Sequence, residues 1–134
     1  YIDAGYAAAS NDRRSASGVA VVFADTTIGW KGSTQKCVTT ATCEGEHVAL
    51  CDESKEALFT RAVMVFLQSE LSGMRVDLFV DNEGSKAIAD SPSSASRTKR
   101  LGVRFYFIQG LIRMGEVRIL HVGTEEQHAD VLTK

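Results

Sequence analysis

The chain has 134 residues, of which 44% are hydrophobic and 24% charged, and its formal net charge is −2. This length suits one domain and this apolar fraction suffices for one buried core, so a disordered chain is excluded. No stretch approaches the roughly 18 consecutive apolar residues of a membrane span, and the N-terminal residues lack the basic and apolar parts of a signal peptide. We therefore expect one domain over residues 1–134 without membrane contact.

The chain ends and the cysteines indicate the context of this domain. The sequence starts without Met and stops at Lys134 with no closing signal, so we expect a domain cut from a longer polypeptide. Cys37, Cys43 and Cys51 cannot all pair and lack Cys-x-x-Cys spacing, which favours free thiols over disulfides or a zinc site. We therefore expect an intracellular protein.

Three β-prone runs open the chain and predict an antiparallel meander. They cover residues 1–6, 18–24 and 28–38, with turn residues at 25–27 and a small, polar connection at 7–17. Residues 42–71 contain one Gly and no Pro, and their apolar residues recur at helical spacing. The pattern predicts one long helix that ends at Ser72 and Gly73.

Strands and helices alternate in the second half of the chain. We expect a strand at 75–80, a short helix at 83–89, a loop at 91–96, a helix at 98–114, a strand at 116–122 and a last helix from Thr124. Helical crossovers of this length join parallel strands. The predicted fold is therefore α/β, with a five-stranded mixed sheet of three antiparallel and then two parallel strands, flanked by helices. We place Trp30 and the aromatic run 105–107 in its core.

Four carboxylates stand at the ends or boundaries of these elements, namely Asp3, Glu46, Asp81 and Asp130. Ligands of open α/β sheets bind beyond the carboxyl ends of strands. If the first and fourth strands are neighbours, Asp3 and Asp81 meet there, and helices can bring in the other two. Clustered carboxylates repel one another unless a cation compensates, and oxygen ligands suit Mg²⁺ or Mn²⁺. Two such ions about 4 Å apart can drive phosphodiester hydrolysis.

Each of these carboxylates also has an ordinary structural interpretation. Asp81 suits the N-cap of the following helix, and Glu44 and Glu46 suit the positive end of a helix dipole. Asp3 is otherwise a strand-end residue and Asp130 a solvated helix residue. Because Glu44 and Glu46 are two residues apart, they face different directions, so at most one joins a common site.

Positive charge is concentrated between residues 91 and 115. This segment has no acidic residue and carries +5, whereas the remainder of the chain carries −7. A basic segment on an acidic body suits a protein that grips a phosphate backbone in one place and gathers carboxylates in another. A solvated helix face is the alternative interpretation.

Motifs along the whole chain resemble, in order, the ribonuclease H domain of copia-type (Pseudoviridae-like) LTR retrotransposon polyproteins. They lie at residues 12–18, 30–31 with 35–36, 43–50, 80–82, 97–99, 103–104 and 124–134. The resemblance implies a ribonuclease H fold with a catalytic Asp, Glu, Asp, Asp set. Asp3 matches the first acid, Asp81 the third in an Asp-Asn motif, and Asp130 the fourth in an Ala-Asp motif. Glu46 matches the second, since Ala49 and Leu50 follow it at the family's spacing.

The resemblance implies a metal-dependent endonuclease that hydrolyses the RNA strand of RNA–DNA hybrids during reverse transcription. It implies two Mg²⁺ ions, with Mn²⁺ as a substitute, bridged by Asp3 and Asp81 and completed by Glu46 at one site and Asp130 at the other. The implied protein partner is the polymerase domain of the same polyprotein, in a cytoplasmic virus-like particle or reverse-transcription complex. Residues expected to contact nucleic acid are Arg13, Arg14, Asn82, Arg97, Lys99, Arg100 and Arg104.

The chain departs from the family pattern at several positions. Gly5 stands where a second Asp is usual, His47 where Tyr is usual and Arg100 where His is usual, and none of these changes removes a catalytic acid. Cellular enzymes carry a mobile His before the last acid, which the loop at 122–124 lacks. His121 or His128 would have to replace it, or each is an ordinary surface residue.

Two other functions stay open. A catalytically decayed or repurposed ribonuclease H-fold module would bind nucleic acid or a protein without cutting, and the retention of all four acids disfavours it. An integrase-like or transposase-like member of the fold would close its acid set with Glu, and Asp130 disfavours that.

Overall fold

The computed structural model describes residues 1–6, 14–39, 41–81 and 99–134, without the side chains of residues 99–101. The predicted helix at 83–89, the loop at 91–96 and most of the connection at 7–17 lie outside the described residues. Within these ranges, no helix is both long and apolar enough to cross a membrane.

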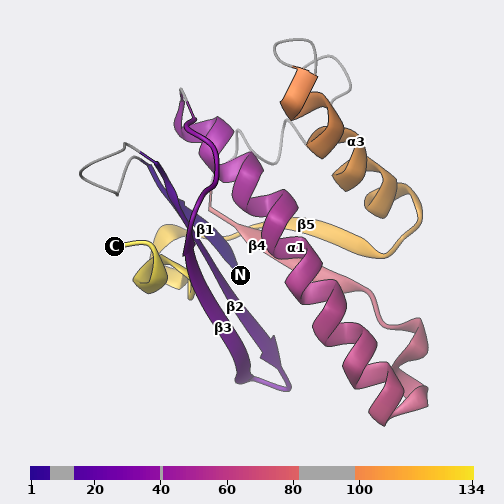
Figure 1. Ribbon diagram of the computed structural model, residues 1–134. Coiled ribbons are helices and arrows are strands. Elements are labelled where there is room, and N and C mark those ends of the chain that lie inside the picture. Colours follow the sequence, from indigo (N-terminus) through magenta and orange to yellow (C-terminus); the bar gives the residue numbers. More distant parts are fainter. Residues whose placement is uncertain (7–13, 40, 82–98) are drawn as a thin grey trace.

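The N-terminal strands form the predicted antiparallel meander. Strands β1 (Ile2–Gly5), β2 (Ala16–Phe23) and β3 (Thr26–Thr34) are hydrogen-bonded in the order β1-β2-β3 (Figure 1). Ala24 and Asp25 join β2 to β3 with φ angles of 48° and 59°. Two successive residues with positive φ make the tight turn whose twist matches a hairpin.

A long helix covers this sheet, and a second, parallel strand pair follows it. Helix α1 (Thr42–Leu67) leads through the 3-10 turn η1 (Ser69–Gly73) to β4 (Val76–Val80). Helix α3 (Lys99–Arg113) packs beside α1, and β5 (Val117–His121) pairs parallel to β4. The α/β class with mixed pairing is confirmed, although α1 gives way to a 3-10 turn four residues before the predicted helix end.

The five strands differ from the prediction in one detail, because they form two hydrogen-bonded sheets. In the part of the chain that the structure describes, β1 and β4 are in contact without a hydrogen-bonded ladder between them. The Ile2 carbonyl of β1 accepts a hydrogen bond from Gln127 Nε2 at 2.9 Å, and the Ala4 amide donates to the carboxylate of Glu46. These backbone groups of β1 therefore bond side chains in place of a neighbouring strand.

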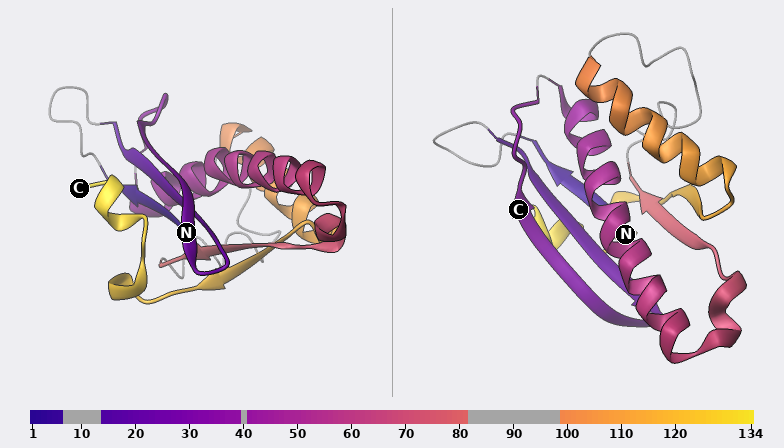
Figure 2. Two further views of the ribbon diagram at one scale, coloured as in Figure 1. Left: turned by 90° about the horizontal axis from the view of Figure 1, so that it is seen from below. Right: turned by 45° about the vertical axis from the view of Figure 1, so that its right-hand side comes forward.

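The predicted C-terminal helix is wrong. Two 3-10 turns, η3 (Thr124–Glu126) and η4 (Asp130–Leu132), take its place, on the side of the three-stranded sheet opposite to α1 (Figures 1 and 2). Gln127 reaches Ile2, Ala129 is fully buried, and Thr133 bonds Asp3. These tertiary contacts tie the segment down at successive points and override its helical pattern.

The core lies between α1 and the strands. Its fully buried side chains come from every layer and include Ile2, Leu50, Leu78, Ile108 and Val117.

Of the aromatic residues placed there from the sequence, Phe105 is buried and Phe107 packs partly against the core, but Trp30 is 73% exposed and Tyr106 is exposed. Trp30 neighbours Lys31, whose side chain turns to α1, and successive strand residues face opposite sides of a sheet. Trp30 therefore points away from α1 into solvent.

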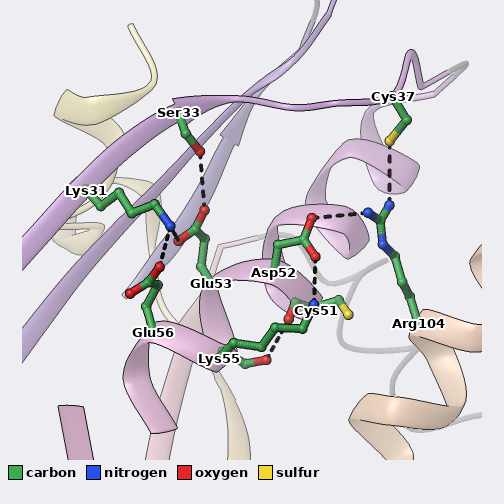
Figure 3. A network of polar contacts seen from close by, with 10 residues as sticks. Lys31, Ser33, Cys37, Cys51, Asp52, Glu53, Lys55, Glu56 and Arg104 are labelled. Carbon is green, nitrogen blue, oxygen red and sulfur yellow. Dashed lines mark hydrogen bonds and ion pairs between the residues drawn. The ribbon is translucent and has the colours of Figure 1, made fainter. Parts of the chain in front are cut away.

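Polar contacts fix α1 to both of its neighbours (Figure 3). Lys31 of β3 pairs with Glu53 and Glu56 of α1, and Arg104 of α3 donates to Asp52 of α1 at 3.1 Å. The Glu53 side chain is only 2% exposed, and burial is the main cause of its raised pKa. The helix that carries Glu46 is thus held from the β3 side and from the α3 side.

Candidate active site

Three carboxylates from distant parts of the chain meet where β1, β4 and α1 come together. Asp3 lies in β1, Glu46 in the second turn of α1 and Asp81 directly after β4. One carboxylate oxygen from each lies within 4.8 Å of the others. The contact between β1 and β4 brings the two aspartates together, and the N-terminal part of α1 adds Glu46. We call these three residues the acidic cluster.

Burial and mutual repulsion perturb this cluster. Asp3 and Glu46 are each 5% exposed. Burial, followed by the charges of Asp3 and Asp81, raises the pKa of Glu46 to about 8, against the opposing hydrogen bond from Ala4. Burial is also the largest cause of the raised pKa of Asp3, where a hydrogen bond from Thr133 opposes it and the charge of Asp81 adds to it. Each ionised carboxylate thus disfavours the ionisation of the next.

The donor set fits a hard divalent cation. Three carboxylate oxygens at this spacing are the ligands that Mg²⁺ and Mn²⁺ prefer. A bound cation would relieve the repulsion that raises the pKa values of Asp3 and Glu46. The acidic cluster is therefore a site that could bind a metal ion.

Asp130 lies beside the acidic cluster. It belongs to η4, and its charge contributes to the raised pKa of Asp3. Among the described residues, the group of converging ligand atoms does not include Asp130, whose carboxylate pairs with Lys134. The structure thus brings together three of the four predicted acids and leaves the fourth nearby.

Glu46, and not Glu44, contributes to the acidic cluster. The Glu46 side chain is buried toward Asp3 and Asp81, whereas Glu44 is half-buried two residues earlier on the helix. This is the separation of faces that their two-residue offset predicts.

The two candidate histidines have different surroundings. His121, at the end of β5, is exposed, with Nε2 3.1 Å from the Asp81 carbonyl oxygen. The His128 ring stacks on Tyr1, with centroids 4.1 Å apart. His121 is therefore the one at the border of the acidic cluster.

The structure describes only some of the residues expected to contact nucleic acid. Arg13, Asn82 and Arg97 lie outside the described residues, and so do the side chains of Lys99 and Arg100.

Arg14 is half-buried before β2. Arg104 is largely occupied within the protein, because its guanidinium donates to Asp52 at 3.1 Å and to Cys37 Sγ at 3.5 Å (Figure 3).

Thr133 is a site residue that the sequence analysis missed. It is buried, and its hydroxyl donates a hydrogen bond to Asp3 Oδ2. The sequence did offer a signal, because Thr133 lies three residues after Asp130 in the same C-terminal motif. The prediction of a helix for this segment did not bring Thr133 to Asp3. Contact with Asp3 depends on the 3-10 turn that replaces that helix.

Sequence comparison relates the chain to transposon polyproteins. It is 31% identical over 134 residues to the retrovirus-related Pol polyprotein from transposon RE2 of Arabidopsis thaliana, and 30% identical over 134 residues to that from transposon RE1. It is 29% identical over 135 residues to that from transposon TNT 1-94 of Nicotiana tabacum. Each match covers this whole chain but only 9–10% of the relative's length. No protein-family model matches the chain.

Structural comparison gives the fold. LC11-RNase H1, isolated from compost, matches with a TM-score of 0.63 at 19% identity, covering 98% of this chain and 89% of that one. Over its whole length the chain is therefore similar to a part of the retrovirus-related Pol polyproteins of these transposons, and it has the ribonuclease H fold.

Proposed function

We propose that the chain is a metal-dependent endonuclease that hydrolyses the RNA strand of RNA–DNA hybrids. The observation that carries the proposal is the meeting of Asp3, Glu46 and Asp81 within 4.8 Å. The ribonuclease H fold and the Pol polyprotein relatives support the same class of reaction. Residues 1–134 would act as one ribonuclease H domain of a longer polyprotein.

The acidic cluster would hold the metal, with Asp130 as an additional carboxylate beside Asp3. When bound, two Mg²⁺ ions, or Mn²⁺ in their place, supply a nucleophile from water and stabilise the departing 3′-oxygen. The protein's part is to present buried carboxylates at fixed positions. Glu46 must release its proton to become a ligand, so metal affinity depends on pH.

The hybrid would be held through its phosphates. The first turn of α3, with Lys99 and Arg100, lies at the same end of the molecule as the first turns of α1 (Figures 1 and 2). The contact of His47 with Phe105 joins the two helices at that end, with ring centroids 6.3 Å apart. The cationic residues of this turn would contact the phosphate backbone of the hybrid near the acidic cluster.

The remaining proposed contacts come from Arg13, Arg14, Asn82 and Arg97. Arg104 would act indirectly, because its pairing with Asp52 fixes α3 on α1.

The setting of the activity is part of the proposal. The relatives are Pol polyproteins about ten times as long as this chain. The polymerase domain of the same polyprotein would therefore be its partner in reverse transcription, in a cytoplasmic virus-like particle or reverse-transcription complex.

A substrate panel tests the proposal. The 134-residue chain is incubated with a labelled RNA–DNA hybrid, single-stranded RNA and double-stranded DNA, each with Mg²⁺, Mn²⁺ or a chelator. We expect cleavage of the RNA strand in the hybrid alone, and only with metal. Binding of the hybrid without cleavage would contradict the proposal and favour a repurposed module. Cleavage or joining of DNA would favour an integrase-like function.

A further inference from the structure

The C-terminal turn η4 lies on the same face of the sheet as Asp3. Asp3, Gly18 and Gly32 are cross-strand partners in one row over β1, β2 and β3, so their side-chain positions share that face. A Cβ at Gly18 would lie 2.9 Å from the Leu132 Cβ, and one at Gly32 would lie 3.1 Å from the Leu132 carbonyl oxygen. The missing side chains let η4 approach the backbone of the sheet closely.

Gly5 extends this docking surface on β1. A Cβ there would overlap the carbonyl oxygen of Thr133. The family pattern usually has an Asp at this position, and that side chain would not fit against the C-terminal turn as it lies here. The close packing of the C-terminal turn on β1 thus depends on Gly5, a position at which this chain differs from the family pattern.

Thr133 uses the two branches of its side chain on different partners. Its hydroxyl donates to Asp3 Oδ2 and lies 3.0 Å from the Asp130 carbonyl oxygen. Its methyl Cγ2 lies 3.0 Å from the point that a Cβ on Gly18 would occupy. The residue is 5% exposed. The hydroxyl has one proton, and an ionised carboxylate is a stronger acceptor than a carbonyl, so Asp3 takes it.

We propose that Thr133 is a positioning residue of the metal site, which holds the carboxylate of Asp3 in the orientation that binds the cation. This inference rests on the proposed function of the acidic cluster. The carboxylate torsion of an aspartate is soft, with a broad distribution of angles. A hydrogen bond from a side chain that is itself fixed removes this freedom before the metal arrives. The glycines of this row let η4 pack against the sheet, and η4 in turn positions the Thr133 hydroxyl beside Asp3.

Two substitutions separate the hydroxyl from the methyl group. Thr133→Val keeps the shape and the contact with Gly18 but removes the donor. Thr133→Ser keeps the donor but removes the methyl. Thr60→Val is the matched control, because the Thr60 hydroxyl donates to the Glu56 carbonyl within α1, away from the acidic cluster.

The test is a calorimetric titration of Mn²⁺ into each metal-free variant of the 134-residue chain, with thermal unfolding measured in parallel. Loss of a partner of a metal ligand typically weakens affinity about 10–100-fold. We expect a loss in this range for Thr133→Val, and affinities within about 3-fold of wild type for Thr133→Ser and Thr60→Val.

Unaltered Mn²⁺ affinity in a folded Thr133→Val variant would overturn the inference while leaving the proposed function intact. If Thr133→Val does not fold, Thr133→Ser still decides. A loss of affinity in the Ser variant would assign the effect to methyl packing and overturn the inference, and retention would support the hydroxyl. A wild-type chain without Mn²⁺ binding would overturn the proposed metal site together with the inference.

Discussion

A carboxylate oxygen of Glu46 in α1 lies within 4.8 Å of one of Asp3 in β1, although 42 residues separate them in the chain. Both side chains are buried, and burial is the largest cause of the raised pKa of each. Two buried acids this close are costly to ionise together without a cation. This relationship makes the stability of the metal-free protein sensitive to pH and to divalent ions.

The first prediction concerns the pH dependence of the metal-free fold. Glu46 carries its proton in both folded and unfolded states below its ordinary pKa of 4.5. Between pH 4.5 and about 8 the unfolded chain releases this proton while the folded protein keeps it, so the free energy of unfolding falls as pH rises. The slope for one proton is about 1.4 kcal/mol per pH unit.

Glu46→Gln should flatten the plot of unfolding free energy against pH between pH 4.5 and about 8, because glutamine does not titrate. Urea unfolding of both proteins in a chelator at several pH values within that window measures the difference. Equal slopes for wild type and variant would contradict the assigned environment of Glu46.

The second prediction separates the two glutamates at the start of α1. Glu46→Gln should damage hybrid cleavage far more than Glu44→Gln, because only Glu46 joins Asp3 and Asp81. Initial rates at saturating Mg²⁺ give the comparison, and each variant is the charge-matched control for the other. Equal losses, or a larger loss for Glu44→Gln, would exclude Glu46 as the second acid.

The third prediction concerns nucleic-acid affinity. Replacing Lys99 and Arg100 by Ala should weaken hybrid binding and make the plot of log affinity against log salt shallower by about 1 per lost phosphate contact. The maximal rate at saturating hybrid should change little. Arg75→Ala with Arg113→Ala is a control of equal charge. Both residues are exposed, Arg75 directly precedes β4, and Arg113 is the last residue of α3. An unchanged salt slope in the Lys99 and Arg100 double variant would identify the first turn of α3 as a solvated face without phosphate contacts.

The fourth prediction tests the packing of the C-terminal turn against Gly5 of β1. Gly5→Ala should lower the free energy of unfolding by about 1–3 kcal/mol, the usual cost of overpacking, because the new Cβ meets the Thr133 carbonyl. Gly110→Ala, inside α3 with open space around it, should instead stabilise by up to about 1 kcal/mol. Denaturant unfolding measures both. A neutral Gly5→Ala would show that the turn does not need the glycine.

The sequence predicted the elements whose contacts are local or periodic. The meander, α1 and the parallel strands follow from runs of β-branched residues, helical spacing and the rule for crossovers. The meeting of Asp3 with Asp81 was predicted on the condition that the first and fourth strands are neighbours, and β1 and β4 are indeed in contact. The two-residue offset between Glu44 and Glu46 allowed only one of them to join the acidic cluster.

The sequence did not predict features that depend on tertiary contacts. The C-terminal segment has the composition of a helix, yet Gln127 and Thr133 bond β1 and hold it in 3-10 turns. Trp30 has a large apolar side chain of the kind usually found in a core, yet it lies on the side of β3 away from α1. Neither outcome has a signal in local propensity.

The rate of hybrid cleavage by wild type and by Asp81→Asn in Mg²⁺ tests whether Asp3, Glu46 and Asp81 form the active site. We expect metal-dependent cleavage by wild type and a loss of more than about 100-fold in the variant, beyond the range typical of residues that only support a metal ligand. The variant should keep its fold, and its metal-free stability should hold or rise because a like charge has left the acidic cluster. Retained cleavage in a folded Asp81→Asn variant would contradict the assignment of Asp3, Glu46 and Asp81 as the active site.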